Sequence, residues 1–79
     1  MNYKKKITDL LKELQSAYER DLIDSIEHTP EWYQIHVLFP QRQPQDMRER
    51  LASHILQTYR DIVRVETSHP SSILIEYQI

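Results

Sequence analysis

Apolar side chains recur at three- and four-residue steps through the first third of the chain and define one helical stripe. The stripe consists of Ile7, Leu10, Leu11, Leu14, Tyr18, Leu22 and Ile26. This spacing predicts a helix from Lys5 to about His28, where Pro30 disfavours a helical backbone at Thr29. Such a helix is about 35 Å long, whereas a strand is commonly about 17–20 Å. We therefore expect part of the stripe to overhang the sheet.

The rest of the chain predicts three strands and a second helix. Strict alternation of apolar and polar residues predicts a strand from Trp32 to Phe39. Pro44 suits the first turn of a helix that runs to about Arg60. The apolar row of this helix consists of Met47, Leu51, Ile55 and Tyr59, widened by Ala52 and Leu56. The last two strands are expected at Ile62–Thr67 and Ile73–Ile79, joined by the turn-forming link 68–72.

These elements predict one α+β domain over residues 1–79, built as a two-layer sandwich in the order α-β-α-β-β. The segment from Trp32 to Thr67 is long enough for a parallel crossover, and the last two strands form an antiparallel hairpin. We therefore expect a three-stranded mixed sheet with both helices on one face.

Alternation along the strands assigns the side chains to two faces of this sheet. The expected inner face consists of Tyr33, Ile35, Val37, Phe39, Val63, Val65, Ile73, Ile75, Tyr77 and Ile79. The expected outer face consists of Trp32, Gln34, His36, Leu38, Ile62, Arg64, Glu66, Leu74, Glu76 and Gln78. A sheet covered on both sides has continuous apolar strands, so the outer face is expected to be partly wet or covered by a partner.

Composition excludes several kinds of site. The chain has no cysteine, which excludes disulfides, thiolate zinc sites and thiol catalysis. It also has no glycine, which excludes a P-loop, a dinucleotide-binding fingerprint, a nucleophile elbow and an EF-hand loop. A core built from 79 residues is thin, and this favours an oligomer.

The net charge of −2 is unevenly distributed along the chain. Lys4, Lys5 and Lys6 open the first helix, and acidic residues including Asp24 and Glu27 follow, so both groups oppose the helix dipole. Antiparallel pairing of two copies would place each lysine cluster beside the partner's acidic end. Two alternatives stay open: arginines of the same chain neutralise the acids, or solvent screens them.

Two sets of candidate binding residues follow from these patterns. The partner-binding candidates are Ile7, Leu11, Leu14, Tyr18, Trp32, Leu38 and Leu74. The anion-binding candidates are Arg42, Arg48 and Arg50, around the start of the second helix, where free N–H groups favour a phosphate or carboxylate. His28, His36, His54 and His69 lack metal-ligand spacing, so no metal or cofactor is expected.

The sequence therefore predicts a non-enzymatic interaction or adaptor protein that forms a homodimer or a subunit of a larger assembly. The alternative is a small nucleic-acid-binding regulator that uses the three arginines. No apolar run approaches the ~20 residues of a membrane span, and the first lysines precede charged residues instead of an apolar signal segment. A cytoplasmic location is expected.

Overall fold

The computed structural model describes residues 3–78, with side chains from residue 7 onward. Two α-helices and four strands confirm the predicted α+β class, but the sheet has one strand more than expected. The elements are α1 (Tyr3–Glu19), β1 (Ser25–Thr29), the 3-10 turn η1 (Pro30–Trp32), β2 (Gln34–Leu38), α2 (Gln45–Thr58), β3 (Ile62–Glu66) and β4 (Ser72–Tyr77).

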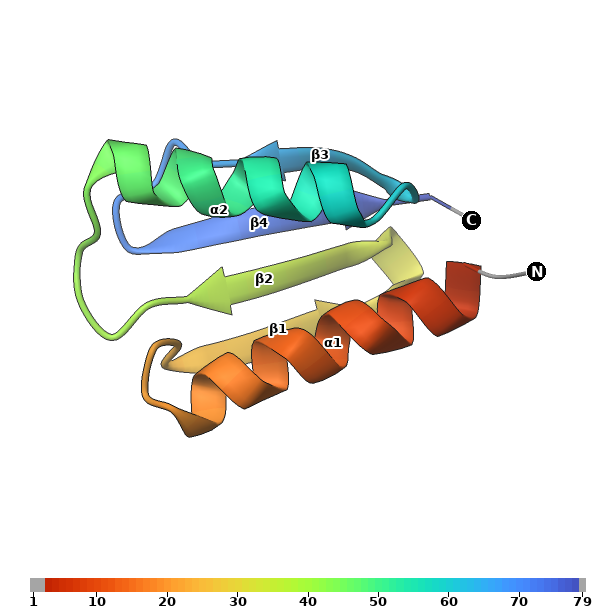
Figure 1. Cartoon of the computed structure of the whole chain (residues 1–79), viewed down its shortest axis with the longest axis horizontal. Helices are drawn as coiled ribbons and strands as arrows, with labels where there is room; N and C mark the ends of the chain where they lie inside the picture. The colour runs from red at the N-terminus through yellow and green to blue at the C-terminus, as the bar shows by residue number, and fades with distance from the viewer. Residues whose placement is uncertain (1–2, 79) are drawn as a thin grey trace.

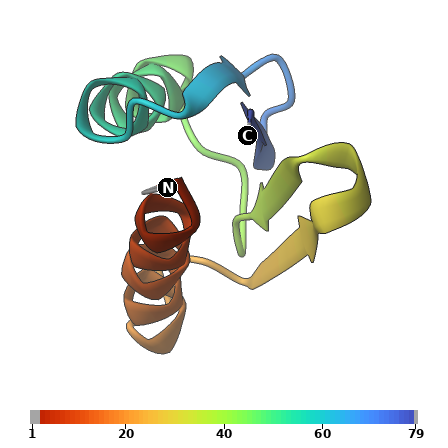
Figure 2. The same ribbon diagram turned by 90° about the vertical axis from the view of Figure 1, so that its right-hand side faces the viewer.

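The four strands form an antiparallel sheet in the order β1-β2-β4-β3. Both helices lie on one face of this sheet and the opposite face carries no helix (Figures 1 and 2). Each half of the chain therefore has the same plan: a helix, an edge strand and a central strand. The two central strands, β2 and β4, pair with each other and join the halves.

The first helix is shorter than predicted because a tight cap ends it at Glu19. The N–H of Leu22 donates to the carbonyl of Ala17 at 3.0 Å, and that of Asp21 donates to Tyr18 at 3.0 Å. This pair of bonds is a Schellman motif, in which one residue takes the left-handed conformation usually given to glycine. In this glycine-free chain that residue is Asp21, with φ of 61°.

The residues predicted to extend the first helix instead form the edge strand β1. Ile26 pairs with Val37 of β2, so its fit to the helical spacing of the first stripe was misleading. The expected overhang of a long helix is therefore wrong. The chain reverses after residue 19 and returns along the sheet beneath α1 (Figure 1).

β2 and β3, which were predicted to be parallel neighbours, are not adjacent in the sheet. β4 lies between β2 and β3 and is antiparallel to both, so the predicted three-stranded mixed sheet is wrong. The predicted hairpin of the last two strands is confirmed, with Val65 opposite Ile75 and Glu66 opposite Leu74.

A β-bulge changes the predicted faces at the start of β3. The register shifts between Ile62 and Arg64, and Ile62 is buried while Val63 is 53% exposed. The prediction had placed Ile62 on the outer face and Val63 on the inner face, which is the reverse of what the structure shows. A bulge adds one residue to one strand and so changes which side chains point inward. Ile79, predicted to close the core, lies outside the described residues.

Trp32 and Tyr33 were predicted to begin the strand, but they lie in the turn between β1 and β2. Trp32 belongs to η1 and is 71% exposed. Tyr33 has φ of 55°, and its N–H donates to the carbonyl of Pro30 at 3.2 Å. Trp32 therefore marks the tip of the β1–β2 hairpin and does not belong to the outer sheet face.

The core lies between the helices and the inner face of the sheet. Its fully buried side chains are Leu10, Ile35, Val37, Ile55, Ile73 and Ile75. The central strands supply four of these six, because β2 and β4 are flanked by strands on both sides. The uncovered surface is therefore the outer face of the same two strands.

Candidate interaction surfaces

The outer face of the sheet presents two rows of side chains that cross all four strands. One row runs Glu27, His36, Leu74 and Glu66, and the next runs Thr29, Gln34, Glu76 and Arg64. Leu38 and Leu74 are half-buried on the two central strands, one diagonal step apart, and Leu38 ends β2 opposite Ser25 and Ser72. On this face the two central strands therefore present the two leucines beside Gln34, His36 and Glu76, and the edge strands present Glu27, Arg64 and Glu66.

Arg64 anchors the charged edge on β3. Its guanidinium contacts the carboxylate of Glu66 on the same strand and lies 3.4 Å from that of Glu76 on β4. The hydrogen bond and charge of Glu66 raise the pKa of Arg64, and the same hydrogen bond lowers the pKa of Glu66. Both side chains are exposed, so this group contributes little to stability and leaves the edge with net negative charge.

The structure divides the predicted partner-binding residues between the core and three separate surfaces. Ile7 and Leu14 are buried in the core of the same chain, and Leu11 packs partly against it. The other four are at least partly exposed: Leu38 and Leu74 on the outer face, Tyr18 on α1 and Trp32 at the hairpin tip. Of these four, only Leu38 and Leu74 are neighbours.

Arg48 has a structural position that the sequence did not suggest. It is 5% exposed, and its Nη1 donates to the carbonyls of Thr67 and His69, the latter at 2.9 Å. Its Nε donates to the carbonyl of Gln43 at 3.1 Å, and its Nη2 donates to the side chain of Gln45. Four of its five N–H donors are thus engaged by neutral oxygens of the chain itself.

The other two arginines of the anion-binding hypothesis do not join Arg48. Arg50 is exposed and pairs with Asp46 one turn earlier in α2, at 3.1 Å. Arg42 is exposed in the loop before α2. The three arginines therefore have different surroundings, and one of them, Arg50, is already paired with a carboxylate.

A carboxylate, a histidine and a tyrosine connect the two helices. Glu13 of α1 accepts a hydrogen bond from the hydroxyl of Tyr59 and lies 2.9 Å from Nε2 of His54 on α2. Burial raises the pKa of Glu13, but these two hydrogen bonds and the charge of His54 outweigh burial and lower it. Burial and the contact with Glu13 raise the pKa of Tyr59. The group acts as a clasp between α1 and α2.

The clasp predicts a change in the acid dependence of stability. Because folding lowers the pKa of Glu13, its contribution is present at neutral pH and is lost as the pH falls through that pKa. Glu13→Gln is expected to remove up to about 1 kcal/mol of this acid-dependent loss between about pH 6 and 3, an upper limit because the side chain is 45% exposed. Urea unfolding across that range measures it. Glu49→Gln, at an exposed site on α2, is the control, and equal flattening by both variants would contradict the assignment.

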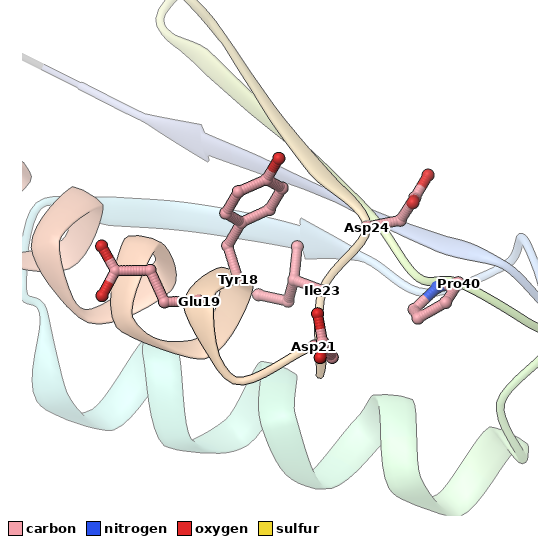
Figure 3. A pocket seen from close by; sticks show the side chains of 6 residues that line it. All are labelled: Tyr18, Glu19, Asp21, Ile23, Asp24 and Pro40. Carbon is pink, nitrogen blue, oxygen red and sulfur yellow. The ribbon is translucent and has the colours of Figure 1, made fainter.

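A shallow hollow of about 370 Å³ lies where α1 turns into β1 (Figure 3). Tyr18, Glu19, Asp21, Ile23, Asp24 and Pro40 line it. The carboxylates of Glu19 and Asp24 point in different directions in Figure 3. Among the described residues no three histidine or acidic side chains are placed to hold a metal ion. The hollow is therefore an acidic part of the surface at the end of α1.

The four histidines have separate surroundings. His28 Nε2 lies 2.7 Å from the hydroxyl of Tyr77, and Tyr33 packs edge-on against the same tyrosine. His36 lies on the outer face, His54 belongs to the clasp, and Nδ1 of His69 accepts the N–H of Ser71. His28 thus stabilises the end of the sheet by linking β1 to β4.

Comparison of the chain with known protein families, with curated proteins and with solved structures gives no match. Neither helix in the described part of the chain is long and apolar enough to cross a membrane. The candidate surfaces are therefore assessed from their own geometry and charge.

Proposed function

We propose that this protein is a non-enzymatic interaction protein of the cytoplasm whose outer sheet face binds a partner protein. The observation that carries the proposal is the uncovered outer face, with Leu38 and Leu74 half-buried between charged edges. Protein interfaces commonly combine an apolar centre with a polar rim.

The charges of the face favour a particular kind of partner. Glu27, Glu66 and Glu76 outnumber Arg64, which is already paired with two of them. A partner surface with an apolar centre and a basic rim complements this arrangement. We therefore expect binding to weaken as salt is raised, because exposed charges are screened.

The size of the face limits the affinity. Four strands about 4.8 Å apart and five residues long present a face of about 19 Å by 17 Å, or roughly 300 Å² in projection. A standard interface buries about 800 Å² on each partner. The face of one copy is therefore suited to a weak or transient complex, unless a neighbouring surface extends it.

A paired capture and titration experiment tests the proposal. The baits are the wild-type chain, Leu38→Lys/Leu74→Lys on the outer face, and Leu56→Lys on α2, where Leu56 is 43% exposed. A protein retained by the wild type and the control is then purified and titrated calorimetrically against all three. We expect the face variant to bind at least about tenfold more weakly than the control.

Two outcomes contradict the proposal. One is equal affinity of the wild type and the face variant for every purified partner. The other is that no protein is retained by both the wild-type bait and the Leu56→Lys control. Circular dichroism and thermal unfolding establish that the face variant is folded, which is expected because both leucines are only half-buried.

A further inference from the structure

The two helices leave a cleft between them on the helix side of the sheet. In Figure 1, α1 and α2 diverge along their length, and the space between them is widest where α1 ends and α2 begins. A cleft of about 230 Å³ lies there. Glu13, which belongs to the clasp with His54 and Tyr59, lines this cleft. The clasp therefore closes the cleft at one end, and the other end is open.

The walls of the cleft are apolar. Leu14 and Ala17 line it from α1, and Met47 and Leu51 line it from α2. Phe39, which is buried directly after β2, lines it as well. Ligand sites commonly combine apolar walls with a few polar groups that fix the orientation of the ligand. The cleft therefore suits the apolar part of a small ligand.

The small side chain of Ala17 keeps the mouth of the cleft open. The N–H of Leu22 donates to the carbonyl of Ala17 in the Schellman motif at the end of α1. In this motif the residue in the position of Leu22 commonly packs against the residue in the position of Ala17. A methyl group covers little of a leucine, and Leu22 is 58% exposed and lines the cleft. A larger side chain at position 17 would fill this space.

One guanidinium borders the cleft without a carboxylate partner. Arg20 follows Glu13 and Ala17 at helical spacing, and all three line the cleft. Nε of Arg20 donates to the carbonyl of Ser16 at 3.3 Å, and within residues 7–78 its two Nη groups have no acceptor. No carboxylate in that part of the chain lies within ion-pair distance of Arg20. Its Nη groups are therefore free to donate to an anion.

The acidic residues next to Arg20 belong to a different surface. Glu19 and Asp21 line the hollow at the end of α1, and Ile23 separates this hollow from the cleft because it lines both. The carboxylate of Glu13 is already held by the clasp. These negative charges lie close enough to disfavour a ligand with several negative charges. The cleft therefore suits a ligand with a single one.

We infer that the cleft binds a small amphipathic carboxylate, with an acyl chain against the apolar walls and its carboxylate on Arg20. A water-sized group occupies about 30 Å³, so a cleft of 230 Å³ holds on the order of eight such groups. This is the size of a medium-length acyl chain. Guanidinium groups bind carboxylates through charge-assisted hydrogen bonds, which fixes the direction of the chain in the cleft.

The cleft is independent of the proposed partner site. It opens between the helices, whereas Leu38 and Leu74 lie on the opposite face of the sheet. Loss of partner binding in the Leu38→Lys/Leu74→Lys variant and loss of the carboxylate site are therefore separate results. The inference stands even if the outer face has no partner.

Titration of the isotope-labelled full chain with sodium octanoate, followed by amide chemical shifts, tests the inference. We expect saturable shifts at Ala17, Leu22 and Met47, with a dissociation constant of about 1 mM. Decanoate is expected to bind about two- to fourfold more tightly for each added methylene, because each one is at least partly buried. Absence of saturable shifts with both carboxylates overturns the inference. Shifts centred on Leu38 and Leu74 also overturn it.

Ala17→Leu fills the cleft and identifies the walls as the binding surface. Leucine keeps a high helix propensity and covers Leu22, so the variant is expected to fold, which urea unfolding checks. Octanoate and uncharged octanol are each expected to bind at least about tenfold more weakly. Ser53→Leu, at an exposed position of α2 outside the cleft, is the matched control and should bind both as the wild type does. Equal binding of octanoate by the wild type and Ala17→Leu overturns the assignment.

Arg20→Gln separates the carboxylate from the chain of the ligand. The exposed arginine is not needed for folding, and its loss is expected to raise the dissociation constant of octanoate about three- to fivefold. The dissociation constant of octanol should stay unchanged, and added salt should weaken octanoate alone. Arg60→Gln, at an exposed position beyond the end of α2, is the control. Equal effects of both arginine variants on octanoate overturn the role of Arg20, and so does octylamine that binds as tightly as octanoate.

The same amides distinguish the other possible occupants of the cleft. Shifts at Ala17, Leu22 and Met47 that follow protein concentration without any octanoate would place a second copy there. A purified partner protein that Ala17→Leu no longer binds, when octanoate causes no shift, would place a protein segment there. Either result overturns the inference of a carboxylate ligand.

Discussion

Arg48→Met is expected to lower the free energy of unfolding by about 3 kcal/mol, because it removes a buried guanidinium that donates to three part-buried backbone carbonyls. The guanidinium of Arg48 connects three segments: the loop before α2, the first turn of α2 and the link between β3 and β4. Methionine has a similar length but no hydrogen-bond donor, so the carbonyls of Gln43, Thr67 and His69 lose this partner. Urea unfolding followed by circular dichroism measures the loss.

Two further variants separate the network of Arg48 from its charge. Arg48→Lys keeps the charge but lacks the planar fork of donors, and an intermediate loss of about 1–2 kcal/mol is expected. Arg50→Met removes an exposed arginine of the same helix and should stay within about 0.5 kcal/mol of the wild type. Equal stability of Arg48→Met and Arg50→Met would contradict the structural role of Arg48.

Leu14→Ala is expected to lower the free energy of unfolding by about 3 kcal/mol, the middle of the range for a buried leucine. Leu14 is 4% exposed and belongs to the core cluster that joins α1 to the sheet. If the sequence interpretation of Leu14 as a partner contact were right, the same change would weaken association and leave the single chain stable. Unfolding by urea at low micromolar protein distinguishes the two.

The matched control is Leu56→Ala, which removes the same atoms from a leucine that is 43% exposed on α2. Its free energy of unfolding should stay within about 0.5 kcal/mol of the wild type, because the exposed side chain buries little apolar surface in the folded state. A loss for Leu56→Ala as large as that for Leu14→Ala would mean that α2 is packed differently from the arrangement described above.

The α+β class, α2 and the last two strands were predictable, because each carries a clear period in its apolar residues. Ile55 of α2 and Tyr59, which caps its end, lie on the predicted row and are buried. In β4, Ile73 and Ile75 alternate with residues of the outer face, as expected. These elements bury one side only, which makes the period visible.

The edge strand β1 was not predictable by the same means. Ile26 falls on the helical stripe by its spacing, and no glycine marks the reversal after α1. Asp21 adopts the left-handed conformation in its place, which aspartate tolerates better than most residues. The order of the strands in the sheet could not be predicted either, because alternation assigns side chains to the two faces and does not indicate which strands are neighbours.

Part of the candidate surface could be found from sequence, but the role of Arg48 could not. Leu38 and Leu74 were assigned to the outer face by alternation alone, and the structure places them there. Arg48 lies four residues before Ala52 and seven before Ile55, on the buried side of α2. This helical spacing is the feature of the sequence from which a buried position for Arg48 could have been predicted. Two of its four hydrogen-bond acceptors come from a loop some twenty residues away, which no local pattern indicates.

The repeated plan of helix, edge strand and central strand has a consequence for the order of folding. Within each half, paired residues such as Glu27 and His36 are close in the chain, whereas His36 and Leu74 at the centre of the sheet are far apart. Closing the longer loop costs roughly 1.3 kcal/mol more in chain entropy. The two hairpins are therefore expected to form early and the central β2–β4 ladder late, so a substitution at the centre slows the rate-limiting docking of the two halves.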